Sequence, residues 1–174
     1  MVIKLVILGI DPGVATVGFG IISVTNGIAK LSRYGVISTS AGTRLALRLK
    51  QINNDVTELI EIFKPEAIAI EELFFNTNQK TALSVAHGRA AIIMAGEEYG
   101  IPMYEYTPLQ VKKAVAGYGR ATKNQVMDMV KRLLSMDQIP KPDDAADALA
   151  IAICHARCAG SLLGKNGKNS ISTI

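Results

Sequence analysis

Near its start the chain contains the run Leu5-Val6-Ile7-Leu8-Gly9-Ile10-Asp11-Pro12-Gly13. Its apolar part is too short to cross a membrane, and the Pro-Gly pair after it is typical of a turn. A short apolar run that stops at a turn predicts a buried β-strand. Asp11 would then lie at the carboxyl end of this strand, although an Asp before Pro-Gly is also a common turn residue.

A second acid ends another apolar run, Ala67-Ile68-Ala69-Ile70-Glu71-Glu72. Strand side chains alternate between the two faces of a sheet, so Glu71 shares a face with Ala67 and Ala69. Glu72 would lie on the opposite face with the isoleucines. Only one of the two glutamates can therefore face a common site.

Two more acids open a helical run, Pro142-Asp143-Asp144-Ala145-Ala146-Asp147-Ala148-Leu149. Residues three apart on a helix share a face, so Asp144 and Asp147 project together from the first turn. The helix dipole alone also favours acids there, which is the structural alternative for either one.

Together these acids indicate a metal site. Like charges within a few ångströms cannot all stay ionised without compensation. Mg²⁺ prefers oxygen ligands and is often held by carboxylates and a substrate phosphate. Two such ions, about 3.5–4 Å apart, can stabilise both the attacking and the leaving oxygen at phosphorus. The pattern predicts a phosphodiester-cleaving enzyme.

The chain resembles the RuvC-type Holliday-junction resolvases of bacteria, which belong to the ribonuclease H-like nucleases. The resemblance runs from about Val6 to about Ala159. The motifs that match are Gly9-Ile10-Asp11-Pro12-Gly13, Gly18-Phe19-Gly20, Ala69-Ile70-Glu71, Gln110-Val111-Lys112-Lys113-Ala114-Val115-Ala116-Gly117-Tyr118-Gly119, Lys123-Asn124-Gln125-Val126 and Asp144-Ala145-Ala146-Asp147-Ala148-Leu149-Ala150-Ile151-Ala152.

The resemblance implies an α/β fold of the ribonuclease H-like type, with a mixed five-stranded sheet flanked by helices. It implies that Asp11, Glu71, Asp144 and Asp147 are the catalytic, metal-binding acids, holding Mg²⁺ at two ions per subunit, with Mn²⁺ as the alternative. The expected products have 5′-phosphate and 3′-hydroxyl ends. A branch-migration motor of RuvA-like and RuvB-like proteins is the partner that it implies.

Basic and aromatic residues suggest DNA contacts. Lys112 and Lys123 lie in and around a glycine-rich loop at helix starts, where unpaired amides and positive side chains suit phosphate. A solvated basic turn is the structural alternative, and the resemblance favours both lysines as contacts near the scissile phosphate. It also points to Phe74 as a residue that wedges against an unpaired base, since base stacking is worth about 1–3 kcal/mol.

A four-way junction has near two-fold symmetry, so paired symmetric nicks call for a C2 homodimer. The long helix from about Thr81 to Tyr99 is the candidate contact, and packing within the subunit is the competing explanation. Its small residues are Ala82, Ala86, Ala90, Ala91 and Ala95.

The expected order of elements is an α/β layer sandwich. An antiparallel meander would open it, with Thr25-Asn26-Gly27 as a hairpin turn, and the strand at 66–71 would return beside the first. The predicted strands are 4–10, 17–25, 28–38, 66–71 and 101–106, and the predicted helices are 43–63, 79–99, 108–116, 123–136 and 143–158.

The composition agrees with one nuclease domain at 1–159 and a flexible tail at 160–174. The chain has 174 residues, 49% of them hydrophobic, and a net charge of +4, which suits a polyanionic partner without proving one. With no leader pattern and no long apolar run, we expect a soluble cytoplasmic protein with no membrane contact. Cys154 and Cys158 are expected to be small apolar core residues rather than a disulfide.

Other functions stay open on the residues alone. The carboxylates would also serve a ribonuclease that cuts RNA–DNA hybrids. Asp-x-Gly after a first strand suits the phosphate loop of an actin-like ATP phosphotransferase, although 174 residues hardly allow its two lobes. A scaffold that binds junctions without cutting them would have no use for four convergent acids.

Overall fold

The computed structural model describes residues 4–73 and 79–164 of the chain. Five strands form one sheet in the order β3-β2-β1-β4-β5. The first three strands are antiparallel neighbours, whereas β4 lies parallel to β1 and β5 parallel to β4. The mixed sheet and the opening meander are as predicted. The strands are β1 (Lys4–Asp11), β2 (Thr16–Thr25), β3 (Ile28–Ser38), β4 (Ala67–Glu71) and β5 (Met103–Tyr106).

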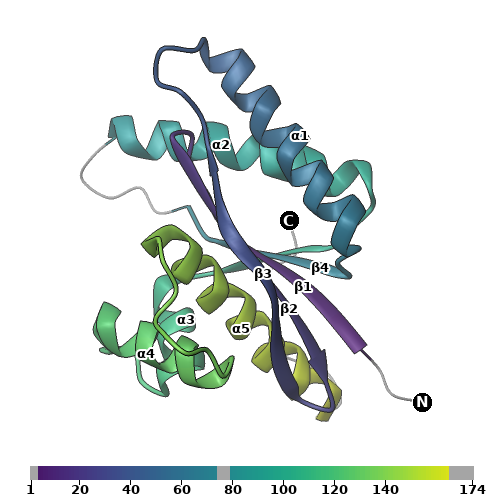
Figure 1. Cartoon of the computed structure of the whole chain (residues 1–174), viewed down its shortest axis with the longest axis vertical. Helices are drawn as coiled ribbons and strands as arrows, with labels where there is room; N and C mark the ends of the chain where they lie inside the picture. The colour runs from purple at the N-terminus through teal and green to yellow at the C-terminus, as the bar shows by residue number, and fades with distance from the viewer. Residues whose placement is uncertain (1–3, 74–78, 165–174) are drawn as a thin grey trace.

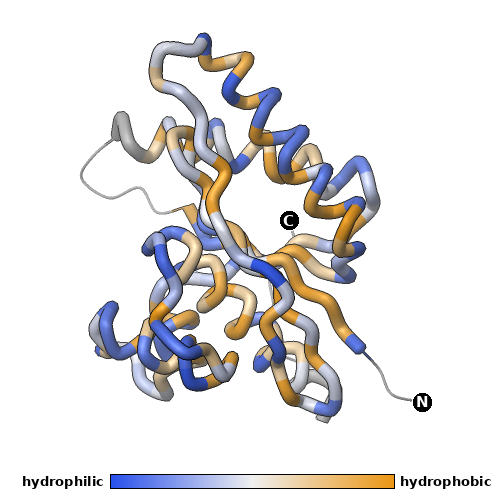
Figure 2. Tube along the Cα trace, in the orientation of Figure 1, coloured by the Kyte–Doolittle hydropathy of each residue, from blue (hydrophilic) through white to orange (hydrophobic). Residues whose placement is uncertain are grey.

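Helices cover both faces of the sheet, with α1 and α2 on one side and α3, α4 and α5 on the other (Figure 1). In Figure 2 the tube of α1 alternates between hydrophobic and hydrophilic residues, as expected for a helix with one buried face. The helices are α1 (Leu45–Phe63), α2 (Gln79–Glu98), α3 (Pro108–Ala116), α4 (Lys123–Leu133) and α5 (Asp143–Gly164).

The sheet separates two hydrophobic cores. On one face, Leu8, Ile10 and Ile70 pack with the buried sides of α1 and α2. On the other, Ile7 and Ala69 pack with α3, α4 and α5. This alternation fixes which residue of each strand faces α5, because side chains on a strand point to opposite faces in turn.

Local signals set the ends of several elements. Asn26 and Gly27 have φ values of 52° and 78°, which suits the tight turn predicted between β2 and β3. Thr107 and Thr122 cap α3 and α4 with complete capping boxes. Lys64 ends α1 in the left-handed conformation, with φ of 48°, one residue before Pro65.

Two helix ends differ from the prediction. Helix α4 stops at Leu133 rather than at 136, because the chain turns through Ser135 with φ of 51°. Helix α5 runs to Gly164 rather than to 158. A helix adds residues at little cost once it has formed, and Gly160 alone does not end it.

Glycines allow α5 to lie directly on the sheet. A side chain at Gly9 would collide with the backbone carbonyl of Ala148, and one at Gly18 with the backbone of Asp144. A side chain at Gly20 would meet Leu149. The absence of side chains at these positions therefore sets how close the first turns of α5 come to β1 and β2.

We expect Gly18→Ala to lower the free energy of unfolding by about 1–3 kcal/mol, the usual cost of overpacking, since the obstructing atoms are backbone and cannot rotate away. Gly42→Ala is the matched control, because its added methyl group would meet only the Ser40 hydroxyl at 3.9 Å. Urea unfolding of both variants measures the difference. Equal stabilities would mean that α5 is free to shift.

Candidate active site

Two of the predicted acids lie at the same edge of the sheet. Strands β1 and β4 are parallel neighbours, and Ile10 pairs with Ile70. Asp11 and Glu71 each follow that pair by one residue. Ile7 and Ala69 of the same strands face α5, and alternation places Asp11 and Glu71 on that face as well.

Helix α5 brings the other two acids to this edge. Its first turn lies over Gly18, the residue of β2 that pairs with Asp11. Asp144 and Asp147 are both half-buried. Both raise the pKa of Asp11 by their charge, so the structure brings together all four acids that the sequence singled out.

The pKa values show how strongly the acids interact. The pKa of Asp11 is raised to about 7, chiefly by burial and then by the charges of Glu71, Asp147 and Asp144. Burial and the charge of Asp147 also raise the pKa of Glu71. Lys123 acts in the opposite direction on both groups. The cluster has more negative charge than Lys123 neutralises.

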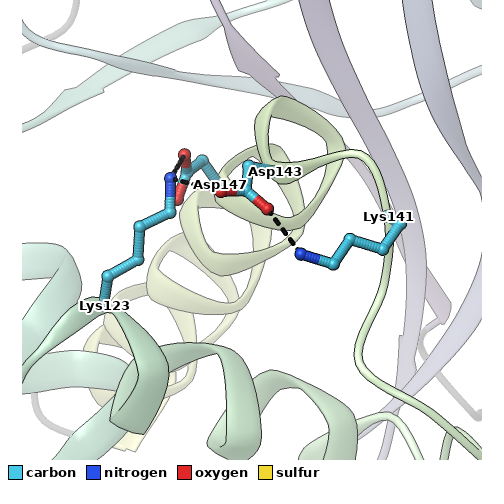
Figure 3. Close-up of polar contacts among 4 residues, drawn as sticks. All are labelled: Lys123, Lys141, Asp143 and Asp147. Atoms are coloured by element: carbon cyan, nitrogen blue, oxygen red, sulfur yellow. Dashed lines mark hydrogen bonds and ion pairs between the residues drawn. The ribbon is translucent and has the colours of Figure 1, made fainter.

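Lys123 lies against the acids of α5. Its Nζ donates to Asp147 Oδ2 at 3.0 Å and pairs with Asp143 Oδ2 at 3.4 Å, as Figure 3 shows. Asp143 also accepts from Lys141 Nζ at 3.0 Å. These two lysines hold the pKa of the Asp143 carboxyl below its usual value. Asp143 is an exposed, already paired acid.

The structure separates each predicted acid from its neighbour in sequence. Asp143 points to lysines at the rim, while Asp144 acts on Asp11. Glu71 shares the α5 side of the sheet with Asp147. Glu72 is exposed and acts instead on Arg89 of α2.

The donor set suits a hard divalent cation. Carboxylate oxygens are the ligands that Mg²⁺ prefers. The pKa of Asp11 is raised chiefly by burial and then by three neighbouring carboxylates, and a bound cation would offset both effects. Within residues 4–73 and 79–164, no three acidic, histidine or cysteine side chains already form a metal shell. Binding a metal would therefore require a rearrangement of these side chains, including Asp147, which now accepts a hydrogen bond from Lys123.

A cavity of about 300 Å³ opens beside the acids, between α3, α4 and α5. Glu71, Asp147, Lys112 and Lys123 line its polar side. Both predicted DNA-binding lysines therefore lie next to the acids. Phe74, the predicted base-contacting residue, lies outside the described residues. The remaining lining is Pro108, Val111, Val126, Met127, Ala150 and Ile151.

Cys154 is buried and both cysteines are free thiols, as expected.

Two basic residues near the acids were not predicted from the sequence. They are Lys141, which pairs with Asp143, and Arg89, which donates to the backbone carbonyl of Glu71. The one signal for Arg89 was a cation directly before the apolar stretch 90–95 of α2. Across the described chain, no helix is long and apolar enough to span a bilayer.

The chain is similar to known proteins along most of its length. Residues 7–155 match the family described as crossover junction endodeoxyribonuclease RuvC. The protein of that name from Caldanaerobacter subterraneus subsp. tengcongensis is 52% identical over 149 residues, covering 86% of this chain and 90% of the relative.

Solved structures agree with this match. The structure of T. thermophilus RuvC in complex with a Holliday junction substrate superposes with a TM-score of 0.86 at 40% identity, covering 89% of this chain and 94% of that one. The yeast mitochondrial Holliday junction resolvase Ydc2 has a TM-score of 0.64 at 18% identity, covering 91% of this chain and 82% of that one. At that identity it supports the fold alone, and the predicted ribonuclease H-like class is confirmed.

We expect Asp11→Asn to stabilise the metal-free protein at pH 8. A raised pKa means that the folded state binds the proton more tightly than the unfolded state, so ionising Asp11 costs stability as pH rises from about 4 to about 7. Removing the charge should return about 1–3 kcal/mol at pH 8 and almost nothing near pH 4.

Urea unfolding in EDTA at pH 4, 6 and 8 measures this difference. The control is Asp137→Asn, which removes an exposed acid outside the cluster and should change stability equally little at each pH. A variant of Asp11 that is less stable than the parent at pH 8 would contradict the electrostatic argument.

Proposed function

We propose that this chain, which belongs to the RuvC family of crossover junction endodeoxyribonucleases, cuts DNA with Asp11, Glu71, Asp144 and Asp147 as its metal-binding acids. Family membership makes it a structure-selective endonuclease that resolves Holliday junctions. The observation that supports the residue assignment is the mutual charge interaction of Asp11 with the other three acids.

The four acids would hold Mg²⁺, with two ions per subunit as the proposed count and Mn²⁺ as the alternative. Such ions neutralise charge at the phosphate and lower the pKa of water. Asp11, which interacts with all three other acids, is the proposed central ligand, and Glu71, Asp144 and Asp147 would hold the ions with it.

Lys112 and Lys123 would bind the substrate backbone beside these acids. An ammonium group contributes to phosphate binding through its charge and three donors. Lys123 now pairs with Asp147, and we propose that it turns to the scissile phosphate when the acids take up a cation. Attack by water with departure of the 3′ oxygen would leave the 5′-phosphate and 3′-hydroxyl ends that ligation requires.

Helix α2 would form the contact of a C2 homodimer. Ala82, Ala91 and Ala95 are buried in the subunit, so for these three residues the competing explanation, packing within the subunit, is correct. Ala90 is exposed, and Leu83 and Met94 are 59% and 67% exposed. Spacings of seven and four residues place these three on one face of the helix. We propose this apolar face as the dimer contact.

Symmetric cutting would follow from such a dimer, since two identical sites related by a two-fold axis match the two opposed strands of a junction. We propose that a RuvA-like and RuvB-like branch-migration motor delivers the junction. The proposed location is the bacterial cytoplasm.

The test is cleavage of an end-labelled synthetic four-way junction in Mg²⁺, beside a linear duplex, an RNA–DNA hybrid and an EDTA control. Glu71→Gln and Asp144→Asn should lower the cleavage rate by roughly 10²–10³-fold or more, the loss expected when a charge-stabilising group is removed. Their sequence neighbours provide matched controls, since Glu72→Gln and Asp143→Asn should cut at near-parental rates.

Junction binding in EDTA should stay close to parental in all four variants, since phosphate contacts come from lysines. Preferential cutting of the hybrid would reassign the substrate. A strong loss in Asp143→Asn but not in Asp144→Asn would reassign the metal-binding acid.

Met94→Glu should convert the dimer to a monomer, because a carboxylate in the core of an apolar interface loses its hydration without gaining a partner. Sedimentation velocity measures the change. Leu47→Glu is the control, since Leu47 is exposed to 47% on a different helix, α1. A dimer that survives Met94→Glu would place the interface elsewhere.

A further inference from the structure

Arg89 is a buried cation in the middle of α2. Its exposure is only 7%, and Arg is almost never buried unless it is paired. Most of its neighbours on the buried side of this helix are apolar, among them Ala91, Ile92 and Ala95. A guanidinium in such a place needs polar partners, and those partners indicate what it does.

The guanidinium contacts two strands at once. Its Nη1 donates to the backbone carbonyl of Glu71 at 2.7 Å, and its Nη2 forms an ion pair with the carboxylate of Glu105. Glu71 ends β4, and Glu105 lies in the neighbouring strand β5. One side chain of α2 therefore ties the end of β4 to β5, beside a proposed metal ligand.

At the Glu71 carbonyl, strand β1 can no longer supply a backbone N–H donor. The pairing of β1 with β4 ends at Ile10 and Ile70. Beyond that pair, β1 continues through Asp11 to Pro12, and proline has no amide hydrogen to donate. The forked guanidinium supplies a donor to the carbonyl at this point and keeps a second N–H for Glu105.

Gly88, the residue before Arg89, brings α2 against the chain that follows β1. A side chain at Gly88 would collide with the backbone carbonyl of Gly13, so α2 lies directly against the turn that follows Asp11. Gly88 and Arg89 are consecutive. One turn of α2 thus contacts both the chain after Asp11 and the carbonyl of Glu71.

We infer that Arg89 is a positioning residue, which holds the end of β4 so that the Glu71 carboxylate and Asp11 can share a metal ion. The inference rests on the proposed roles of these two acids. Arg89 touches neither the reacting atoms nor a carboxylate of the cluster in this geometry, so its effect on cleavage would act through Glu71.

Arg89→Lys tests this role, because lysine keeps the charge but loses the fork that reaches two acceptors at once. We expect the Mg²⁺ concentration for half-maximal junction cleavage to rise by about tenfold or more, the loss typical of removing a group that orients a metal ligand. Saturating Mg²⁺ should recover most of the rate. Calorimetric titration with Mn²⁺ alone, without DNA, should show the same weakening.

Glu105→Gln is a second variant, which loosens the guanidinium without removing its bond to Glu71, and it should shift the metal dependence less, in the same direction. Arg48→Lys is the matched control. Arg48 is a partly buried arginine of α1, whose Nε donates to the Thr39 hydroxyl at 2.8 Å, and its replacement should lower stability without changing metal binding.

The possible outcomes distinguish failure of the positioning role of Arg89 from failure of the proposed function. Weakened metal binding in Arg89→Lys, beside unchanged metal binding in Arg48→Lys at a similar loss of thermal stability, supports the positioning role. Parental metal binding in folded Arg89→Lys, with Glu71→Gln defective, overturns it and leaves the proposed function intact. If Glu71→Gln also binds metal and cuts normally, the proposed function itself fails.

Discussion

The repulsion among four carboxylates is the constraint on which the rest of this structure depends. Asp11, Glu71, Asp144 and Asp147 come from three distant parts of the chain, and burial together with the charges of the other three raises the pKa of Asp11 to about 7. Bringing like charges together opposes folding in the absence of a cation. The energy that holds them must come from the scaffold, and two hydrophobic cores on opposite faces of one sheet supply it.

The scaffold holds the acids together because the backbones of its strands and helices approach one another closely. Parallel pairing of β1 with β4 sets two acids side by side, and helix α5 then crosses the sheet at positions where glycine leaves room for it. On the opposite face, α2 lies against the turn after Asp11 and donates to the Glu71 carbonyl. Both layers of helices therefore meet the same edge of the sheet. A displacement of either layer would separate the acids.

Two lysines beside this acidic cluster are the proposed contacts for a polyanionic substrate. Lys123 lies on Asp147 at 3.0 Å, and Lys112 lines the same cavity. An exposed ion pair of this kind contributes little stability, so the lysine is free to exchange its carboxylate partner for a phosphate. The similarity to T. thermophilus RuvC bound to a junction covers 89% of the chain, which includes most of the scaffold described above.

Much of this protein was determined by local sequence. Apolar runs, the Asn26-Gly27 turn and the two Thr-x-x-Gln caps predicted the strands and helices, because these signals act within a few residues. The motifs around Asp11, Glu71 and Asp144 indicated the family. Strand alternation, helix spacing and the family motifs also singled out Glu71, Asp144 and Asp147, whereas only the tertiary structure showed that Asp143 pairs with Lys141 while Asp144 lies by Asp11. It also decided that Arg89 contacts Glu71, because a contact across 18 residues depends on how a helix lies against a sheet, and no local pattern specifies that placement.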